Sequence, residues 1–420
     1  MTDVEIRPLR PGDDMDAQAD LSERAFGKMS ESERGSFKRS HAGRVNGGAF
    51  LGAFAGGRPV GAANYHDMRQ WWHGRAVPMA GVAGVKMAPE YRGRGIGRRL
   101  MTELLGQIAE RGYPLSALYP ATMAIYRSLG WELAGARYQM TVPARELRTL
   151  LAPDADLPGA DLPGGGVPGG AAPARDLAAA VNAVDIRRAG PADAGAVIAV
   201  ASRAHEAARD NGPLTRDAGT MADWLARDGL YAYLADDGFI AYRWAGGNGD
   251  LHIERIHAAA PVTARALWSV VASHSSTADT VTARLGPLDP LWWLTRERDV
   301  AVARRSMWML RVVDAPAAIA ARGFPPAVSL SVPLVIADQT RPSNSGAWEL
   351  TITGGKGTLT PSAAGDGAPF TVGARGLAAL YGGTPVRTLR MAGLASGGTP
   401  DTDAALDAAF GAPAFMLDDF

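Results

Sequence analysis

A glycine-rich turn between a predicted strand and a predicted helix is the part of this 420-residue chain best suited to chemistry. Apolar Val82, Val85 and Met87 predict the strand. The turn, R-G-R-G-I-G at residues 92–97, precedes apolar residues that recur at helical spacing over 100–108. Backbone N–H groups converge at the start of such a helix, and glycines without a Cβ atom let a phosphate approach closely. The segment therefore predicts an anion site.

The spacing of the turn narrows the choice of phosphate ligand. It matches neither G-x-G-x-x-G nor G-x-x-x-x-G-K-[ST], which excludes the dinucleotide and Walker-type patterns. It does match R-x-x-G-x-G at Arg92, Gly95 and Gly97. This motif resembles the pyrophosphate loop of the GNAT-type N-acetyltransferases, which bind acetyl-coenzyme A there. The alternative is a glycine-rich connection without function.

A tyrosine downstream of the turn is a candidate catalytic acid. Tyr126 lies on a predicted short helix that ends in R-S-L-G-W at 127–131. GNAT-type enzymes commonly place a tyrosine on this helix, and a phenol near a thioester sulfur could protonate the departing thiolate. The alternative is a tyrosine packed in an amphipathic core.

The composition narrows the class of protein. Apolar residues make up 47% and charged residues 20% of the chain, and the 43 basic and 43 acidic side chains balance to zero. A nucleic-acid or membrane-surface partner held by bulk charge is therefore not expected. The chain has no cysteine, which excludes disulfides and thiolate sites, and the histidines do not predict a metal site. With no apolar stretch of membrane-spanning length, we expect a cytoplasmic protein.

The elements that carry these residues occur twice. With a shift of 180 residues, 4–14 aligns with 184–194, and 50–62 aligns with 230–242. In the second copy, an alignment shifted by about 171 residues places Ala266 and Trp268 opposite Gly95 and Gly97, so we expect that copy to keep the fold and to lack the cofactor loop.

The predicted boundaries follow from this repeat and from composition. They are a first domain at 1–150, a Gly/Pro/Ala-rich linker at 151–180, a degenerate second copy at 181–308 and a small α+β domain at 309–420.

The order of the three domains resembles the enhanced intracellular survival (Eis) family of actinobacterial N-acetyltransferases. The resemblance includes VKMAPEYRGRGIGRRLM, IYRSLGW and the ending DAAFGAPAFMLDDF. It implies an α/β fold of tandem GNAT-type domains, each a mixed sheet flanked by helices, with the second degenerate. A sterol-carrier-protein-like α+β domain follows them. It also implies a homohexamer that uses acetyl-coenzyme A to acetylate primary amines of aminoglycosides or lysine-like substrates.

The resemblance also assigns roles to residues. It implies that Tyr126 is the general acid and that the terminal carboxylate of Phe420 is the general base. Asp418 and Asp419, beside it, would attract polycationic substrates. The Ala121–Thr122 pair departs from the Ser-Glu pair of the best-known relative. The implied cofactor contacts are Val85, Lys86, Met87, Arg92, Gly93, Arg94, Gly95, Ile96, Gly97, Arg98, Ala121 and Thr122.

Two other functions fit parts of the sequence. One is a lipid or small-molecule carrier with a vestigial acetyltransferase domain. The other is a dedicated protein-lysine acetyltransferase. The intact glycine turn beside a degraded copy speaks against the carrier, because a vestigial loop should resemble the degraded one.

Overall fold

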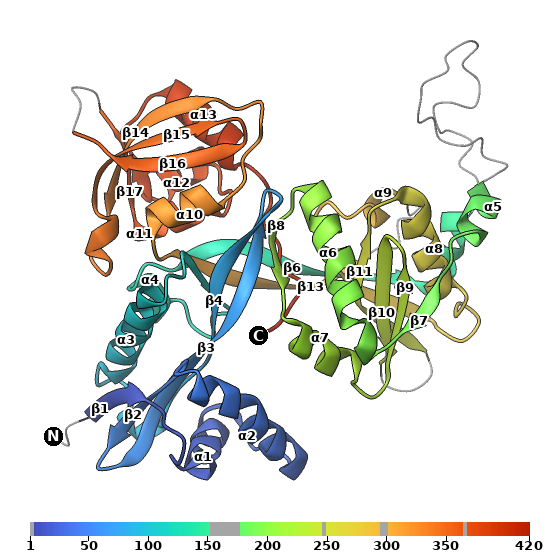
Figure 1. Ribbon diagram of the computed structural model, residues 1–420, viewed down its shortest axis with the longest axis horizontal. Coiled ribbons are helices and arrows are strands. Elements are labelled where there is room, and N and C mark those ends of the chain that lie inside the picture. The colour runs from blue at the N-terminus through green and yellow to red at the C-terminus, as the bar shows by residue number, and fades with distance from the viewer. Residues whose placement is uncertain (1–3, 152–176, 246–248, 295–300, 364–367) are drawn as a thin grey trace. The chain divides into compact units, whose positions relative to one another are not determined.

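The computed structural model describes residues 4–151, 177–245, 249–294, 301–363 and 368–420 (Figure 1). Most of the predicted linker therefore lies outside the described residues. The chain forms two compact units. Unit 1 comprises residues 1–135, 307–414 and 418–420, and unit 2 comprises 136–306 and 415–417.

Unit 1 contains a mixed sheet built mainly by the N-terminal part of the chain. Neighbours along it are antiparallel except β4 and β5, which run parallel. In spatial order its strands are β1 (Val4–Pro8), β2 (Phe50–Ala55), β3 (Arg58–Trp72), β4 (Arg75–Met87), β5 (Leu115–Leu118) and the end of β13 (Ala301–Val312).

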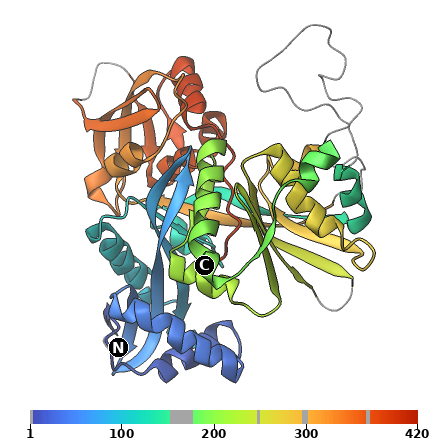
Figure 2. The same ribbon diagram turned by 45° about the vertical axis from the view of Figure 1, so that its right-hand side comes forward.

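Helices cover both faces of this sheet. Leu51 packs with α3 (Ile96–Glu110), whereas the adjacent Phe50 packs with residues of α1 (Met15–Phe26) and α2 (Glu31–Asn46). Because successive side chains of a strand point to opposite faces, α3 lies on one face and α1 and α2 on the other. Figures 1 and 2 both show α1 and α2 side by side.

A β-bulge interrupts β4 where the sequence predicted the strand. Ala62 pairs with Lys86 and Asn64 with Ala83, so β4 holds one residue more than β3 across this step. Gly84 lies in the bulge at φ +60°, where a side chain would be strained and a Cβ would lie 2.6 Å from Asn64 Nδ2. The pairing of β4 with β5 ends at Gly81, so β4 continues to Met87 with an open edge on that side.

The C-terminal part of unit 1 is an α+β domain with a five-stranded sheet. Its strand order is β16 (Lys356–Pro361), β15 (Gly346–Thr353), β14 (Leu330–Ala337), β17 (Phe370–Gly373) and β18 (Ala395–Ser396). Its helices are α10 (Ala315–Ala321), α11 (Ala374–Tyr381), α12 (Val386–Met391) and α13 (Pro400–Phe410). A buried ion pair between Arg311 and Asp338, at 2.6 Å, ties the strand that enters this domain to the segment after β14.

Unit 2 repeats the design of the first sheet. Its β9 (Leu230–Ala235) and β10 (Gly238–Trp244) begin 180 residues after β2 and β3, as the repeat predicted, and β11 (Asp250–Ala258) runs parallel to β12 (Thr280–Leu285) as β4 does to β5. Its other elements are β6 (Glu132–Pro143), α5 (Leu177–Asn182), β7 (Arg187–Ala189), α6 (Ala194–Ala208), β8 (Asn211–Thr215), α7 (Ala218–Leu225), α8 (Pro261–Ala272) and α9 (Leu291–Leu294).

The predicted alignment of the two glycine-loop positions was wrong in its register. The helix of the second copy, α8, begins at Pro261 after the cap residue Ala260, so Trp268 lies in the middle of the helix and not at its start. Trp268 is buried because it packs in the core of unit 2. The start of α8 still carries no glycine, so the second copy does lack the glycine turn. The residues that replace the turn are Ala260, Pro261 and Val262.

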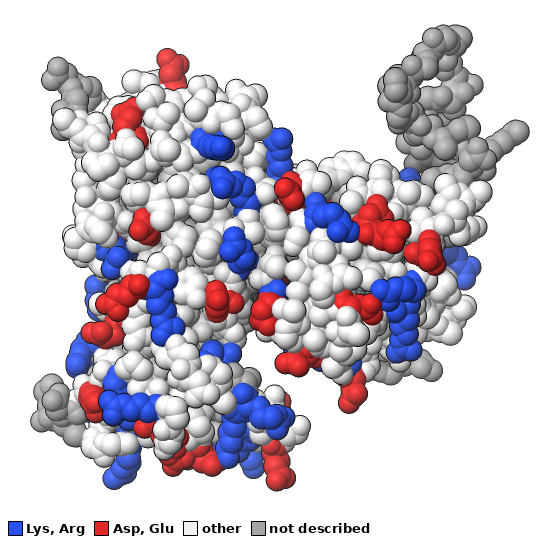
Figure 3. All heavy atoms as spheres, viewed as in Figure 1, with Lys and Arg blue, Asp and Glu red and all other residues white. Residues whose placement is uncertain are grey.

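Charges of both signs alternate on the surface face that Figure 3 shows, in keeping with the zero net charge. Across the described ranges, no helix has the length and apolar character needed to cross a membrane.

Candidate active site

The glycine turn lies between a short 3-10 helix, Pro89–Tyr91, and α3. Gly93 and Gly95 have φ of +75° and +76°, a left-handed conformation that favours glycine, and a Cβ on either would point into open space. Gly95 caps α3 without a side-chain hydrogen bond. The first turn of a 15-residue helix therefore presents its N–H groups to any anion that enters.

Gly97 is a glycine that the protein fold does not require. It lies inside α3, and a Cβ there would be 3.5 Å from Ile125 Cδ1 and 3.7 Å from Met87 Cγ, which is ordinary contact. Ile96 is buried, and Arg92, Arg94 and Arg98 are exposed around the turn. The residues present therefore fit a pyrophosphate group, with room for it and cations near it.

Tyr126 lies on α4 (Ala124–Arg127) and is 6% exposed. It packs in the same core cluster as Ala80 and Val82 of β4, with its ring edge-on to Trp131. Burial raises the pKa of the Tyr126 phenol, so the side chain stays protonated well above neutral pH. A protonated phenol beside β4 can act as an acid.

Near its open edge, the side chains of β4 point to opposite faces of the sheet. Val85 and Met87 pack toward the cluster around α3, whereas the side chain of Lys86 lines a cavity on the other face. Lys86 can therefore meet a cofactor on the α3 side only through its backbone. Ala121 and Thr122 lie exposed in the loop between β5 and α4.

The last residue of the chain is docked against β4. A Cβ on Gly81 would lie 2.9 Å from Phe420 Cδ2, so glycine is needed there to admit the ring. The Phe420 ring also lies 5.7 Å from the Tyr119 ring, and the Tyr119 hydroxyl donates a hydrogen bond to the Asp418 carbonyl at 2.8 Å. Ala80 and Val82 pack in the same cluster as Tyr126, and Gly81 between them faces Phe420, so Phe420 and Tyr126 lie on opposite faces of β4.

Phe420 lines a cavity of about 320 Å³ within unit 1. This volume lies at the lower end of the range for small-molecule sites. The other lining residues are Ser22, Phe26, Gly27, Met29, Phe37, His41, Arg44, Asn64, His66, Ala83, Gly84 and Lys86. They do not include Asp418, which is buried, or Asp419, which is exposed.

Most of the cavity wall was not predicted from the sequence. Phe37, His41 and Arg44 lie on α2 at spacing i, i+4 and i+7, which places them on one face of a mostly polar helix. That spacing was the available signal. Asn64 and His66, two residues apart on β3, share a face of their strand and complete the wall.

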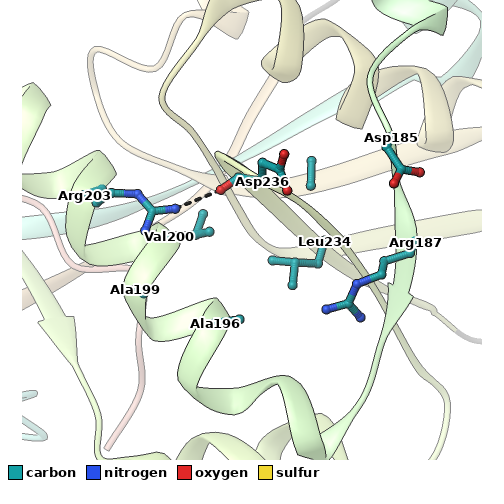
Figure 4. A pocket seen from close by; sticks show the side chains of 9 residues that line it. Asp185, Arg187, Ala196, Ala199, Val200, Arg203, Leu234 and Asp236 are labelled. Carbon is teal, nitrogen blue, oxygen red and sulfur yellow. Dashed lines mark hydrogen bonds between the residues drawn. The ribbon is translucent and has the colours of Figure 1, made fainter.

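A second cavity, of about 240 Å³, lies in unit 2 between α6 and the strands β7 and β9 (Figure 4). Its arginines already have partners. Arg187 is paired with Asp193 at 2.7 Å, and Arg203 donates to the Asp236 carbonyl at 2.8 Å. Among the described residues, no group of three or more histidine and acidic side chains could hold a metal ion.

Comparison with known proteins places these features in a family. Models of the acetyltransferase (GNAT) domain match residues 5–134 and 212–312, and a sterol carrier protein domain model matches 315–417. The crystal structure of a GCN5-related N-acetyltransferase from Kribbella flavida is 41% identical, with all of this chain and 98% of that chain covered and a TM-score of 0.88. The chain belongs to the GCN5-related N-acetyltransferase (GNAT) family. The predicted fold class, two GNAT-type domains followed by a sterol-carrier-protein-like domain, is confirmed.

Within the GNAT family, the predicted resemblance to Eis proteins is also confirmed. N-acetyltransferase Eis of Mycobacterium tuberculosis is 29% identical over 330 residues, which cover 74% of this chain and 73% of that protein. The structure of Eis1 from Mycobacterium abscessus, 23% identical with full coverage of both chains and a TM-score of 0.73, shows the same fold. The protein is an N-acetyltransferase, while the predicted boundaries at 150, 180 and 308 stay predictions.

Proposed function

We propose that this GNAT protein transfers the acetyl group of acetyl-coenzyme A to a primary amine, with Tyr126 as general acid and the terminal carboxylate of Phe420 as general base. The observation that carries this proposal is the docking of Phe420 against Gly81, on the face of β4 opposite to Tyr126. An acid and a base on the two faces of β4, where its pairing with β5 ends, suit a reaction that takes a proton from one reactant and returns one to the other.

The glycine turn supports the choice of cofactor. Acetyl-coenzyme A, when bound, supplies the acetyl group as a thioester. The N–H groups at the start of α3 and the exposed Arg92, Arg94 and Arg98 would hold its pyrophosphate, and Gly97 leaves space for it. Because the pairing of β4 with β5 ends at Gly81, backbone N–H groups of β4 beyond it, near Val85, could donate to the thioester oxygen.

The protein residues then move two protons. The amine attacks the thioester carbonyl as its proton passes to the Phe420 carboxylate. A new C–N bond forms and the C–S bond breaks. The Tyr126 hydroxyl gives its proton to the departing thiolate, so free thiol and acetylated amine leave the enzyme.

Aminoglycosides and lysine-like amines, which the sequence predicted, stay predictions, as do the homohexamer and the role of Asp418 and Asp419. One assay distinguishes the rival functions: the release of thiol is measured with acetyl-coenzyme A and primary amines. No thiol release with any amine, together with binding of a lipid probe, would favour the carrier.

Replacement of Tyr126 by Phe tests the acid directly. We expect kcat to fall by about 10²–10⁴-fold, the range typical of a lost general acid, with little change in the KM for acetyl-coenzyme A. Tyr113→Phe is the matched control, because Tyr113 packs against the same cluster, near Tyr65, and has no role in the proposed mechanism. Full turnover of Tyr126→Phe would remove Tyr126 from the mechanism.

A further inference from the structure

The cavity at Phe420 is positively charged. Arg44 and Lys86 both line it, and Lys86 is only 4% exposed. Within the described parts of the chain, neither side chain forms an ion pair with a carboxylate. Lys86 instead donates to the Ser22 hydroxyl and lies over the Phe37 ring, 4.7 Å from its centroid. Arg44 contacts His66 Nδ1 at 3.2 Å, and its buried Nε has no partner.

These two cations act on each other unfavourably. Burial and the charge of Arg44 lower the pKa of Lys86 to about 8, and burial also lowers the pKa of Arg44. His41 does not relieve the repulsion, because burial and Arg44 lower its pKa to about 3 and leave it neutral near pH 7. The aromatic contact and the hydroxyl stabilise Lys86 without neutralising it. An incoming anion would gain from both cations at once.

The carboxylate of Phe420 is the one negative group that the lining residues supply. This single carboxylate does not balance the charges of Arg44 and Lys86, so the cavity keeps an excess of positive charge. A cavity of this sign repels a substrate with several ammonium groups and attracts one with an oxyanion. Phe26, Met29 and Phe37 form the apolar part of the wall and suit an apolar or aromatic body.

We propose that the preferred acceptor is an amine that also carries an oxyanion, a carboxylate or phosphate, and that Arg44 and Lys86 bind this group. The inference rests on the proposed function and narrows its substrate class. Arg44 and Lys86 are specificity-determining residues in this proposal, because they select the acceptor and take no part in the proton transfers.

Matched acceptors test the charge preference. L-phenylalanine and L-phenylalaninamide differ in the oxyanion and share their shape, and the amide has the less basic amine. Intrinsic reactivity at neutral pH thus favours the amide, whereas we expect a kcat/KM at least ten-fold higher for phenylalanine. O-phosphoethanolamine against ethanolamine distinguishes phosphate from carboxylate. A wild-type preference for the neutral member of both pairs, or for the polycation kanamycin over all four, would overturn the inference while leaving acetyl transfer intact.

Variants test which residues carry the preference. We expect Arg44→Met and Lys86→Met each to lower the acid-over-neutral ratio of kcat/KM at least ten-fold. Arg39→Met is the control, because Arg39 is an exposed arginine on the same helix outside the cavity wall. An unaltered ratio in both cavity variants contradicts the proposal. Failure of the wild type to acetylate any amine contradicts the proposed function itself.

A binding measurement gives a readout that does not depend on turnover. We expect N-acetyl-L-phenylalanine, which keeps the carboxylate, to raise the Tm of the wild-type protein more than N-acetyl-L-phenylalaninamide does. The difference should be lost in Arg44→Met and kept in Arg39→Met. Equal shifts with both compounds in the wild type would count against an oxyanion site.

Discussion

A substitution at Gly97 should affect the stability of the fold and the binding of the cofactor in opposite ways. Its Cβ would make ordinary contacts inside α3, so Gly97→Ala should stabilise the helix by about 0.5–1 kcal/mol. If the coenzyme pyrophosphate approaches this position, the same change should raise the KM for acetyl-coenzyme A at least ten-fold. Steady-state kinetics and thermal unfolding measure the two effects.

Gly106→Ala is the matched control for that prediction. Gly106 lies on the same helix, and a Cβ there would meet open space. We expect a similar rise in Tm and an unaltered KM. Equal KM values for the two variants would show that the glycine turn does not hold the coenzyme as proposed.

Lys86 should give the stability of the protein a pH dependence. Its folded-state pKa of about 8 lies below the ordinary 10.5, so the unfolded chain holds the additional proton between these values. The free energy of unfolding that Lys86 controls is therefore lower below pH 8 and rises as the pH goes from 8 to 10.5. From pH 7 to pH 10, we expect wild type to gain about 2–3 kcal/mol relative to Lys86→Met in urea unfolding. A constant difference between the two proteins would show that burial does not depress this pKa.

At the scale of elements, the Arg311–Asp338 pair joins β13 to the segment that follows β14. Both side chains are fully buried, and Asp338 also accepts a hydrogen bond from Asn344 Nδ2 at 3.0 Å. Asp338→Ala leaves the guanidinium buried without its partner, so we expect a loss of about 3–5 kcal/mol. The partly exposed pair of Arg390 and Asp403 is the comparison.

Chemical denaturation measures this difference. Asp403→Ala should cost no more than about 1 kcal/mol, because water screens that pair. A loss at Asp338 as small as the loss at Asp403 would show that water reaches Arg311 and that the network does not hold these elements together.

Local features of the elements were predictable from the sequence, and tertiary ones were not. The glycine turn, the helix after it and the starts of β9 and β10 follow from spacing within a few residues or from the repeat. The alignment of the second copy with the glycine turn failed because Trp268 packs in the core of unit 2 from the middle of α8. Its position in the sequence therefore does not indicate where that helix begins. The cationic wall was missed because Arg44 and Lys86 belong to different elements, which only the folded chain brings to one cavity.

At the scale of the whole molecule, the fold brings the end of the chain back to the N-terminal part of unit 1. The last three residues belong to the compact unit that holds the glycine turn, about 320 residues earlier in the chain. The resemblance to the Eis family predicted a role for Phe420, but not the contacts of its ring with Gly81 of β4 and with Tyr119, which only the folded chain shows. If the Phe420 carboxylate is the base, as proposed, activity should depend on where the chain ends.

An extension of the chain tests this dependence. Two glycines added after Phe420 keep every side chain but move the free carboxylate away from the cavity, so we expect kcat to fall at least 100-fold with an unaltered Tm. Gly81→Ala should lower kcat by a different route, because its Cβ displaces the Phe420 ring. Two glycines added before Met1 are the control and should leave kcat unaltered. Full activity of the C-terminally extended protein would mean that another group, or water, accepts the proton from the amine.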